Sequence, residues 1–282
     1  MSQFGIGLGL AGPPALRQNA ARYGPLARDY FARLDAANLR VNAYDAANAR
    51  LIDRLVSNGG NFWPDSGAFC AMAGYLFPPD DTLIPLKDGH DAGTLKAFVT
   101  GDWNAVTGLK GNGSTKYVDS NRAADVEPLN DISAGVYISA PLSANEVGQS
   151  VLGSREEASS AFEIFTRELH YYIRNRSHAD RAGSDPGVTD SYTGYLGTSR
   201  SNSSDFLIRD NDTDTTQTLS SGATNPYNIY VFARNDSGTG FLGTRADFRL
   251  PFYHIGPNLS GAGELAELDS ILTDWQTDLA AA

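Results

Sequence analysis

Three aspartates at alternate positions form the strongest ionic cluster in the sequence. Asp210, Asp212 and Asp214 lie in the segment RDNDTDTTQT. Carboxylates spaced in this way on a loop can chelate Ca²⁺, which takes oxygen ligands from several directions. An EF-hand loop starting at Asp210 would need glycine at its sixth position and glutamate at its twelfth, where this chain has Thr215 and Ser221. The segment therefore has two interpretations, a calcium site of another type or an exposed polar loop.

Paired acids for glycoside hydrolysis are not evident in the sequence. That reaction needs a general acid and a nucleophile or base held at a fixed separation. Glu163 and Glu168 are five residues apart, so on one strand they would face opposite sides of a sheet. Glu156 and Glu157 lie in a polar stretch before that strand. We therefore predict that the chain is not an enzyme.

Nucleophilic catalysis and histidine-based metal binding have no motif here either. The chain has no G-x-S-x-G elbow and no H-x-x-x-H pair. His90, His170, His178 and His254 are predicted to be structural or exposed to solvent. The single cysteine, Cys70, is flanked by Phe69 and Met72 and is predicted to be a small buried hydrophobe. We expect no cofactor.

Sugar binding needs an aromatic ring for stacking, with amide and carboxylate partners beside it. The residue types suited to this are Tyr192 and Tyr195 near Asp190, Asn202 and Asp205, together with Trp63 and Trp103. The sequence does not distinguish them from core aromatics, so it assigns no sugar site. A locally basic stretch contains Arg174, Arg176 and Arg181, which could meet an acidic glycan or a neighbouring protein.

Composition excludes several classes of partner. The formal net charge is −11 over 282 residues, so the chain would be repelled by nucleic-acid backbones and by anionic membranes. We expect no nucleic-acid binding. No window has the ~18 apolar residues of a membrane span, and the N-terminus lacks the pattern of a signal peptide. We expect no membrane insertion and synthesis in a reducing cytosol.

Three regions are expected along the chain. Residues 1–24 form a glycine-rich arm in which GIGLGL could add an extended strand to another protein. Residues 25–80 form a helical cap. It contains two helices within 25–57 and a third helical piece from Ser66 to Leu76. Residues 81–282 form a β-sandwich with a C-terminal helix at Gly263–Leu279.

The β-sandwich is predicted from short apolar bursts separated by Gly, Asn and Ser turns. The stretch from Asn225 to Ile255 is dense in aromatic and β-branched residues, and it predicts neighbouring antiparallel strands of a covered sheet. Further strands are expected at Leu83–Leu86, Lys96–Thr100, Lys116–Val118, Ala134–Ala140, Glu163–Thr166, Leu169–Arg174, Tyr192–Thr198 and Asp205–Arg209.

Three groups of motifs, in this order, resemble a family of bacteriophage virion proteins. They are FGIGLGL followed by YFARLDAANLRVNAYDAANARLIDRLV, then TGLKGNGSTKYVDSN with DISAGVYIS, then IYVFARNDSGTG with RLPFYHIG. The family carries a concanavalin A-like, laminin-G-like jelly roll. Gly111–Asp119 is similar to its first signature strand and Phe252–Gly256 to its last. Residues 175–225 are longer and more polar than the family pattern.

The resemblance implies a fold and a role but names no catalytic residue. It implies a non-enzymatic protein of the virion, in a tail fibre, baseplate or head spike, that contacts host-surface glycan. The arm would bind other virion proteins, and the protein would be a homo-oligomer. Two alternatives stay open, a capsid decoration protein that stabilises the particle and a capsule-degrading glycan hydrolase.

Overall fold

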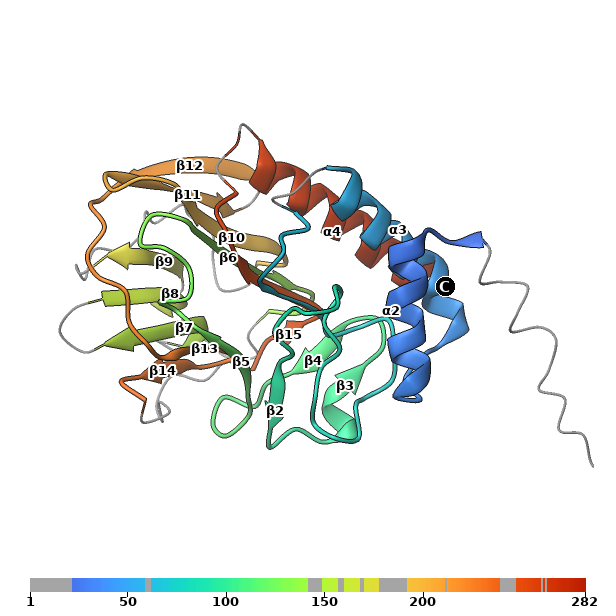
Figure 1. Ribbon diagram of the computed structural model, residues 1–282. Helices are drawn as coiled ribbons and strands as arrows, with labels where there is room; N and C mark the ends of the chain where they lie inside the picture. The colour runs from blue at the N-terminus through green and yellow to red at the C-terminus, as the bar shows by residue number, and fades with distance from the viewer. Residues whose placement is uncertain are drawn as a thin grey trace, which may run out of the picture.

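The computed structural model describes residues 22–58, 62–141, 149–156, 160–167, 170–177, 192–210, 212–238, 247–259, 261 and 263–282. In this part of the chain two β-sheets pack face to face, and helices cover the outer face of one of them (Figure 1). The predicted mainly antiparallel β-sandwich of jelly-roll type, with N-terminal helices and a C-terminal helix, is confirmed. Most of the predicted arm, residues 1–24, lies outside the described residues.

The sheet under the helices is called the first sheet. Its order is β1 (Ala68–Ala71), β16 (Phe252–Gly256), β6 (Ile132–Ile138), β10 (Gly194–Arg200), β11 (Asp205–Asp210) and β12 (Thr213–Thr218). Every pair in it is antiparallel. β1 and β12 are therefore its two edges.

The opposite sheet is called the second sheet. Its order is β2 (Thr94–Lys96), β5 (Tyr117–Ala123), β13 (Asn228–Val231), β7 (Ser150–Glu156), β8 (Ser160–Arg167) and β9 (His170–Ser177). β14 (Arg234–Asp236) pairs with β7 in parallel. A small third sheet contains β15 (Arg249–Leu250), β4 (Gly108–Lys110) and β3 (Trp103–Asn104).

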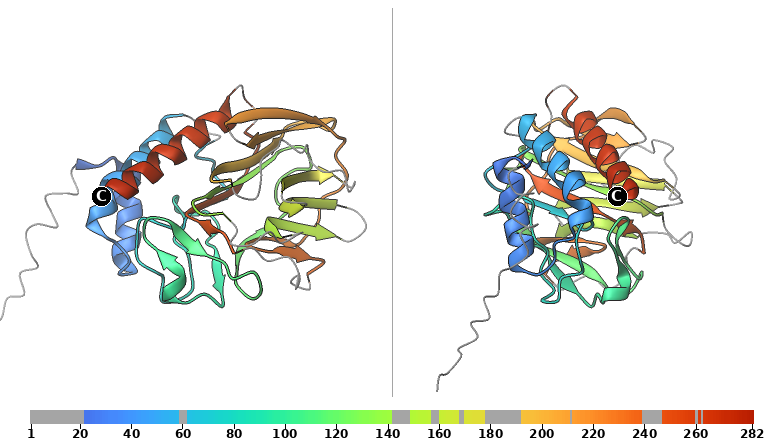
Figure 2. Two further views of the ribbon diagram at one scale, coloured as in Figure 1. Left: turned by 180° about the vertical axis from the view of Figure 1, so that it is seen from behind. Right: turned by 90° about the vertical axis from the view of Figure 1, so that its right-hand side faces the viewer.

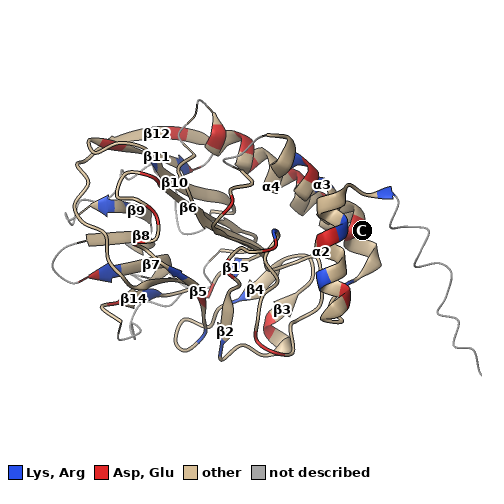
Figure 3. Ribbon diagram, viewed as in Figure 1, with Lys and Arg blue, Asp and Glu red and all other residues tan. Residues whose placement is uncertain are grey.

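The helical layer consists of α2 (Pro25–Ala36), α3 (Asp45–Ser57) and α4 (Glu264–Ala281), with short 3₁₀ turns at η2 (Asn42–Tyr44) and η3 (Thr100–Asp102). Figure 2 shows α3 and α4 running side by side across the first sheet. Two ion pairs link these helices. Arg50 on α3 lies 2.7 Å from Asp278 on α4, and Arg54 lies 3.2 Å from Glu267. Figure 3 shows acidic residues along α4. These pairs are exposed, so each contributes little.

The strands of the first sheet that lie under the helices, among them β1 and β16, are buried on both faces. Along β1, Ala68 and Cys70 enter the core between the sheets, while Phe69 and Ala71 enter the core under the helices. β16 alternates in the same way and is buried at every position. Successive side chains of a strand point to opposite faces, so such a strand has no polar face.

This double burial explains two errors of the sequence interpretation. The predicted helical piece from Ser66 to Leu76 is wrong, because β1 occupies its centre. A short apolar run without polar alternation fits a buried helix and a buried strand equally well. The predicted pairing of neighbouring strands within Asn225–Ile255 is also wrong, because β13 lies in the second sheet and β16 in the first.

Other strand predictions were met in part. Leu83–Leu86 is not a strand, and around it there are isolated bridges of Thr82 with Thr94 and of Pro85 with Cys70. β7 and β12 were not predicted. β7 ends in polar residues, and β12 has the sequence TDTTQT, which contains no apolar residue.

A buried polar pair lies inside the core under the helices. The Tyr195 hydroxyl and His254 Nε2 are 2.7 Å apart, and both side chains are fully buried. Burial lowers the pKa of His254 to about 3, so the imidazole is neutral. The Tyr195 ring lies over Gly135 and Gly197, where a Cβ atom would overlap its ring and hydroxyl. The absence of a side chain at both positions therefore leaves the space that the Tyr195 ring occupies.

We expect Gly197→Ala to destabilise the protein by about 1–3 kcal/mol, the usual effect of overpacking a core. The added methyl would displace Tyr195 from His254. Gly101→Ala is the matched control, since nothing lies within 4 Å of its Cβ position. Urea unfolding of the two variants measures the difference, and equal stabilities would show that the core adapts around Tyr195.

Candidate functional site

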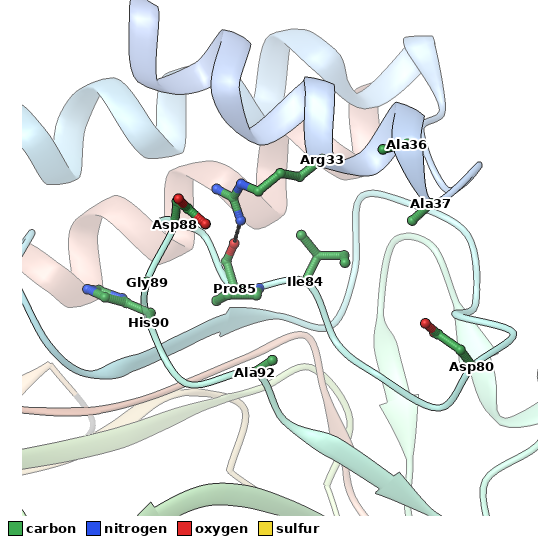
Figure 4. A pocket seen from close by; sticks show the side chains of 10 residues that line it. All are labelled: Arg33, Ala36, Ala37, Asp80, Ile84, Pro85, Asp88, Gly89, His90 and Ala92. Atoms are coloured by element: carbon green, nitrogen blue, oxygen red, sulfur yellow. Dashed lines mark hydrogen bonds between the residues drawn. The ribbon is translucent and has the colours of Figure 1, made fainter.

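An open pocket lies between α2 and the segment 80–92 that follows β1 (Figure 4). Its volume is about 570 Å³, and ligand pockets usually span about 300–1,000 Å³. The lining residues combine a guanidinium, two carboxylates, an imidazole and small apolar groups. They are Arg33, Ala36, Ala37, Asp80, Ile84, Pro85, Asp88, Gly89, His90 and Ala92.

Arg33 fastens α2 to the opposite wall of the pocket. Its Nη1 donates to the Pro85 carbonyl at 2.5 Å, and its Nη2 donates to the Leu86 carbonyl at 2.9 Å. Its Nε donates to Asp29 at 3.1 Å, one helical turn earlier. Three of its N–H groups are thus engaged within the protein. The guanidinium sets the width of the pocket and has limited capacity left to neutralise an anionic ligand.

The segment 80–92 is itself held by the first sheet. The Leu86 N–H donates to the Phe69 carbonyl at 2.8 Å, and Pro85 forms a bridge with Cys70. Both contacts are with β1, the edge strand. The pocket wall therefore rests on a rigid element, which favours a preformed site.

His90 lies in the wall of the pocket with its ring buried. The imidazole is 7% exposed, and its Nε2 lies 2.8 Å from the Pro64 carbonyl. A carbonyl can only accept, so Nε2 carries the hydrogen and Nδ1 is left with its lone pair. Nδ1 is buried and has no hydrogen-bond partner. Burial lowers the pKa of His90, which keeps the ring neutral.

The charge of the lining is negative at neutral pH. Asp80 and Asp88 are both exposed, His90 is neutral, and Arg33 is the single cation among the lining residues. The exposed carboxylates offer acceptors, while Ala36 and Ala37 offer small apolar surface. Hydroxyl groups donate to acceptors of this kind, whereas an anionic ligand would be repelled. The lining suits a neutral, hydroxyl-rich molecule.

The aromatic residues considered for sugar stacking do not line this pocket. Tyr195 is buried beneath the helices, and Tyr192 donates its hydroxyl to the Tyr195 carbonyl at 3.0 Å. Trp103 donates to the Tyr75 carbonyl at 2.9 Å, while Trp63 lies beside His90 with ring centroids 6.5 Å apart. Of their suggested partners, Asn202 and Asp205 bond to each other in an exposed turn, and Asp190 lies outside the described residues.

The sequence interpretation missed most residues of the pocket. Neither Arg33 nor the carboxylates of Asp80 and Asp88 were singled out. Of the lining residues only His90 was named, as a structural or solvent-exposed histidine.

The three aspartates of the calcium hypothesis lie in three different environments. Asp210 ends β11 and is 3% exposed, Asp212 is exposed in the turn, and Asp214 on β12 pairs with Arg209 at 3.1 Å. In the parts of the chain that the structure describes, no three His, Cys, Asp or Glu side chains form a group suited to a metal ion. The calcium interpretation of these three residues stays a prediction. The segment is the tip of the β11–β12 hairpin. The spacing of its aspartates, at every second residue, matches the two-residue period of a strand.

Glu163 is engaged by arginines. Its Oε1 lies 3.1 Å from Arg234 and its Oε2 lies 3.4 Å from Arg174, with Glu163 itself 1% exposed. Arg176 is buried as well and donates to the Glu127 carbonyl at 3.0 Å, while Arg181 lies outside the described residues. Arg174 and Arg176 thus serve internal contacts, and the locally basic stretch does not appear as a surface formed by these two side chains.

Comparison with known proteins informs the fold. No family model matches the chain, and no curated protein matches its sequence. Among solved structures, a mutant of Trypanosoma rangeli sialidase that displays trans-sialidase activity is similar with a TM-score of 0.50 and 10% identity, over 74% of this chain and 33% of that one. The chain spans about a third of the length of this sialidase. The likeness supports the β-sandwich architecture and nothing further.

Two other similar structures have TM-scores below 0.5 and carry no argument. Trypanosoma rangeli sialidase matches at 0.49 with 12% identity, covering 74% of this chain and 33% of that chain. The CBM40 module of Ruminococcus gnavus IT-sialidase, bound to alpha2,3 sialyllactose, matches at 0.43 with 13% identity, covering 57% and 96%. Among the described residues, no helix is long and apolar enough to cross a membrane.

We expect the stability of the protein to depend on the ionisation of Asp210. Burial raises the pKa of this carboxyl to about 6, with Arg209 opposing the rise and Asp214 adding to it. Because the folded-state pKa lies above the ordinary value near 3.8, the stabilising contribution is fully present below pH 3.8 and is lost as pH rises through 6. Asp210→Asn should therefore melt at a higher temperature than the parent at pH 7.5.

The same difference in melting temperature should shrink at pH 4.5, where Asp210 of the folded parent is largely protonated. Asp53→Asn, at an exposed position of α3, is the control and should change neither value. A gain that is equal at both pH values would show that the ionisation of Asp210 is not its cause.

Proposed function

We propose that the chain is a non-enzymatic, glycan-binding component of a bacteriophage particle. The virion assignment is supported by the resemblance of its motifs, and the glycan assignment is supported by the pocket between α2 and the segment 80–92. The single observation that carries the glycan proposal is the lining itself, in which two exposed carboxylates lie in one pocket with small apolar side chains. A sugar presents hydroxyl donors and C–H faces to match these groups.

The pocket favours a neutral glycan over an acidic one. Asp80 and Asp88 would repel a carboxylated sugar, and three N–H groups of Arg33 are already bound to the protein. The likeness to sialidases therefore does not extend to the proposed ligand, since sialic acid carries a carboxylate. A host-surface polysaccharide built from uncharged sugars is the ligand that this lining fits.

The proposal of a non-catalytic role rests on the acids that the fold positions. Glu163, the strand glutamate closest to a hydrolase pattern, has both oxygens bound by arginines. It is buried away from the pocket lining. An acid that donates a proton to a leaving group needs access to the glycosidic oxygen. Glu163 has no such access in this arrangement.

Filling the pocket should abolish glycan binding without unfolding the protein. Ala36 is exposed at the pocket rim on α2, so Ala36→Tyr would place a ring in the site. We expect at least a tenfold loss of affinity for neutral oligosaccharides, measured on a glycan array and by calorimetry. Ala32→Tyr, on the same helix but outside the pocket, is the matched control and should bind as the parent does.

The same measurements separate the alternatives. Preferential binding of sialyllactose would contradict the assignment of a neutral ligand, and binding that is insensitive to Ala36→Tyr would move the site elsewhere. Release of reducing ends from host polysaccharide would make the chain a hydrolase. If no glycan binds and particles stripped of the protein lose stability, the protein is instead a capsid decoration.

A further inference from the structure

The four edge strands of the two sheets differ in how they are protected. An open edge presents a row of unpaired backbone N–H and C=O groups, and natural sheets usually block it. β1 is blocked by the segment 80–92, through the Leu86 N–H bond and the Pro85 bridge. β2 is only three residues long, and Leu83 and Leu95 make backbone bonds to Gly93 and Asp81 beside it.

β9, at the far edge of the second sheet, is also interrupted. Arg176 has a left-handed backbone with φ of 57°, and the register with β8 shifts nearby. The Gly222 N–H donates to the Arg176 carbonyl at 2.6 Å, so a connecting segment occupies this end of the edge. A bulge and a covering segment are both recognised devices of edge protection.

Within the residues that the structure describes, β12 has no register shift and no further strand beside it. It keeps a regular register with β11 over six residues, from Thr218 opposite Asp205 to Thr213 opposite Asp210. Its sequence, TDTTQT, contains no lysine or proline and is rich in threonine, which favours strands. In the described part of the chain no other strand pairs with it. Most of its residues are exposed, and Figure 1 shows it at the outer margin of the first sheet.

We propose that β12 pairs antiparallel with β12 of a second copy of this chain, which joins the two first sheets into one continuous sheet across a two-fold axis. In this arrangement the backbone of the second copy's β12 extends the hydrogen-bond ladder beyond the edge strand. This arrangement is β-augmentation with the same segment on both sides.

The composition of β12 is complementary to itself. Backbone groups of successive residues point to alternate sides of a strand, so a two-fold antiparallel pair must be centred on one residue. Centring on Thr215 sets Asp214 opposite Thr216, and centring on Thr216 sets Asp214 opposite Thr218. Neither register brings the two copies of Asp214 face to face, and opposite like charges are what destabilise cross-strand pairs.

The one carboxylate of the strand is paired within each copy. Arg209 on β11 contacts Asp214 at 3.1 Å and Asp269 of α4 at 3.0 Å. Asp214 is the single charged residue of β12. The net charge of −11 opposes association of two copies, as does the exposed Asp212 beside the strand, and salt screens this repulsion.

Sedimentation of the full chain tests the proposal. We expect a dimer mass at high micromolar concentration and a monomer mass for the double variant Thr215→Lys and Thr216→Lys, which places like charges at the two-fold axis in either register. The control is Thr277→Lys, at an exposed threonine of α4, which should leave the dimer intact. A monomeric parent, or a dimer that the double lysine variant preserves, would overturn the proposal.

Oxidative crosslinking tests the register independently of stability. Directly opposed residues of an antiparallel pair have Cα atoms roughly 4.5–5.5 Å apart, within disulfide range. Thr215→Cys or Thr216→Cys should give a covalent dimer on mild oxidation, since one of them lies on the axis. Thr277→Cys should not, and the native Cys70 is buried. Equal crosslinking at 277 and at the β12 positions would mean that the copies meet by random collision.

Discussion

The structure depends on one constraint, the coverage of the first sheet on both faces. The central strands of this sheet lie between the helices and the second sheet and have no face exposed to solvent. Each of them must therefore supply apolar side chains on both faces. β1 meets this with a continuous apolar run, and β16 does so at Phe252, Tyr253 and Ile255. Polar groups that remain inside must bond to one another, as Tyr195 and His254 do at 2.7 Å. The glycines under Tyr195 follow from the same requirement.

The same constraint explains why the segment 80–92 is where it is. β1 is an edge strand with two buried faces, and its free backbone groups would otherwise be exposed beside apolar surface. The segment runs along that edge and bonds to Phe69. It then meets α2 through Arg33, and the space left between helix and segment is the pocket. Edge protection and pocket formation are thus two consequences of one chain path.

Sequence patterns predicted those parts of the fold where polarity alternates clearly. α3 and α4 have an apolar stripe and a charged face, and both were located correctly. Patterns failed where both faces share one character, as in β1, which is wholly apolar, and β12, which is wholly polar. The candidate pocket could not be predicted from the sequence for another reason. Arg33 and His90 are distant in sequence, and only the docking of α2 on the edge segment brings them to one cavity.

The positions of the pocket and of the open edge have a consequence for binding. β1 and β12 are opposite edges of the first sheet, so pairing through β12 leaves both pockets free at the distant ends of the joined sheet. Each site alone would bind a glycan weakly, as a shallow open pocket does. Two sites on one rigid sheet convert the second binding event into an intramolecular one, provided that the repeat of the host polysaccharide spans the distance. A repetitive surface polymer meets that condition more readily than a single oligosaccharide, so avidity and not the depth of the pocket would determine attachment.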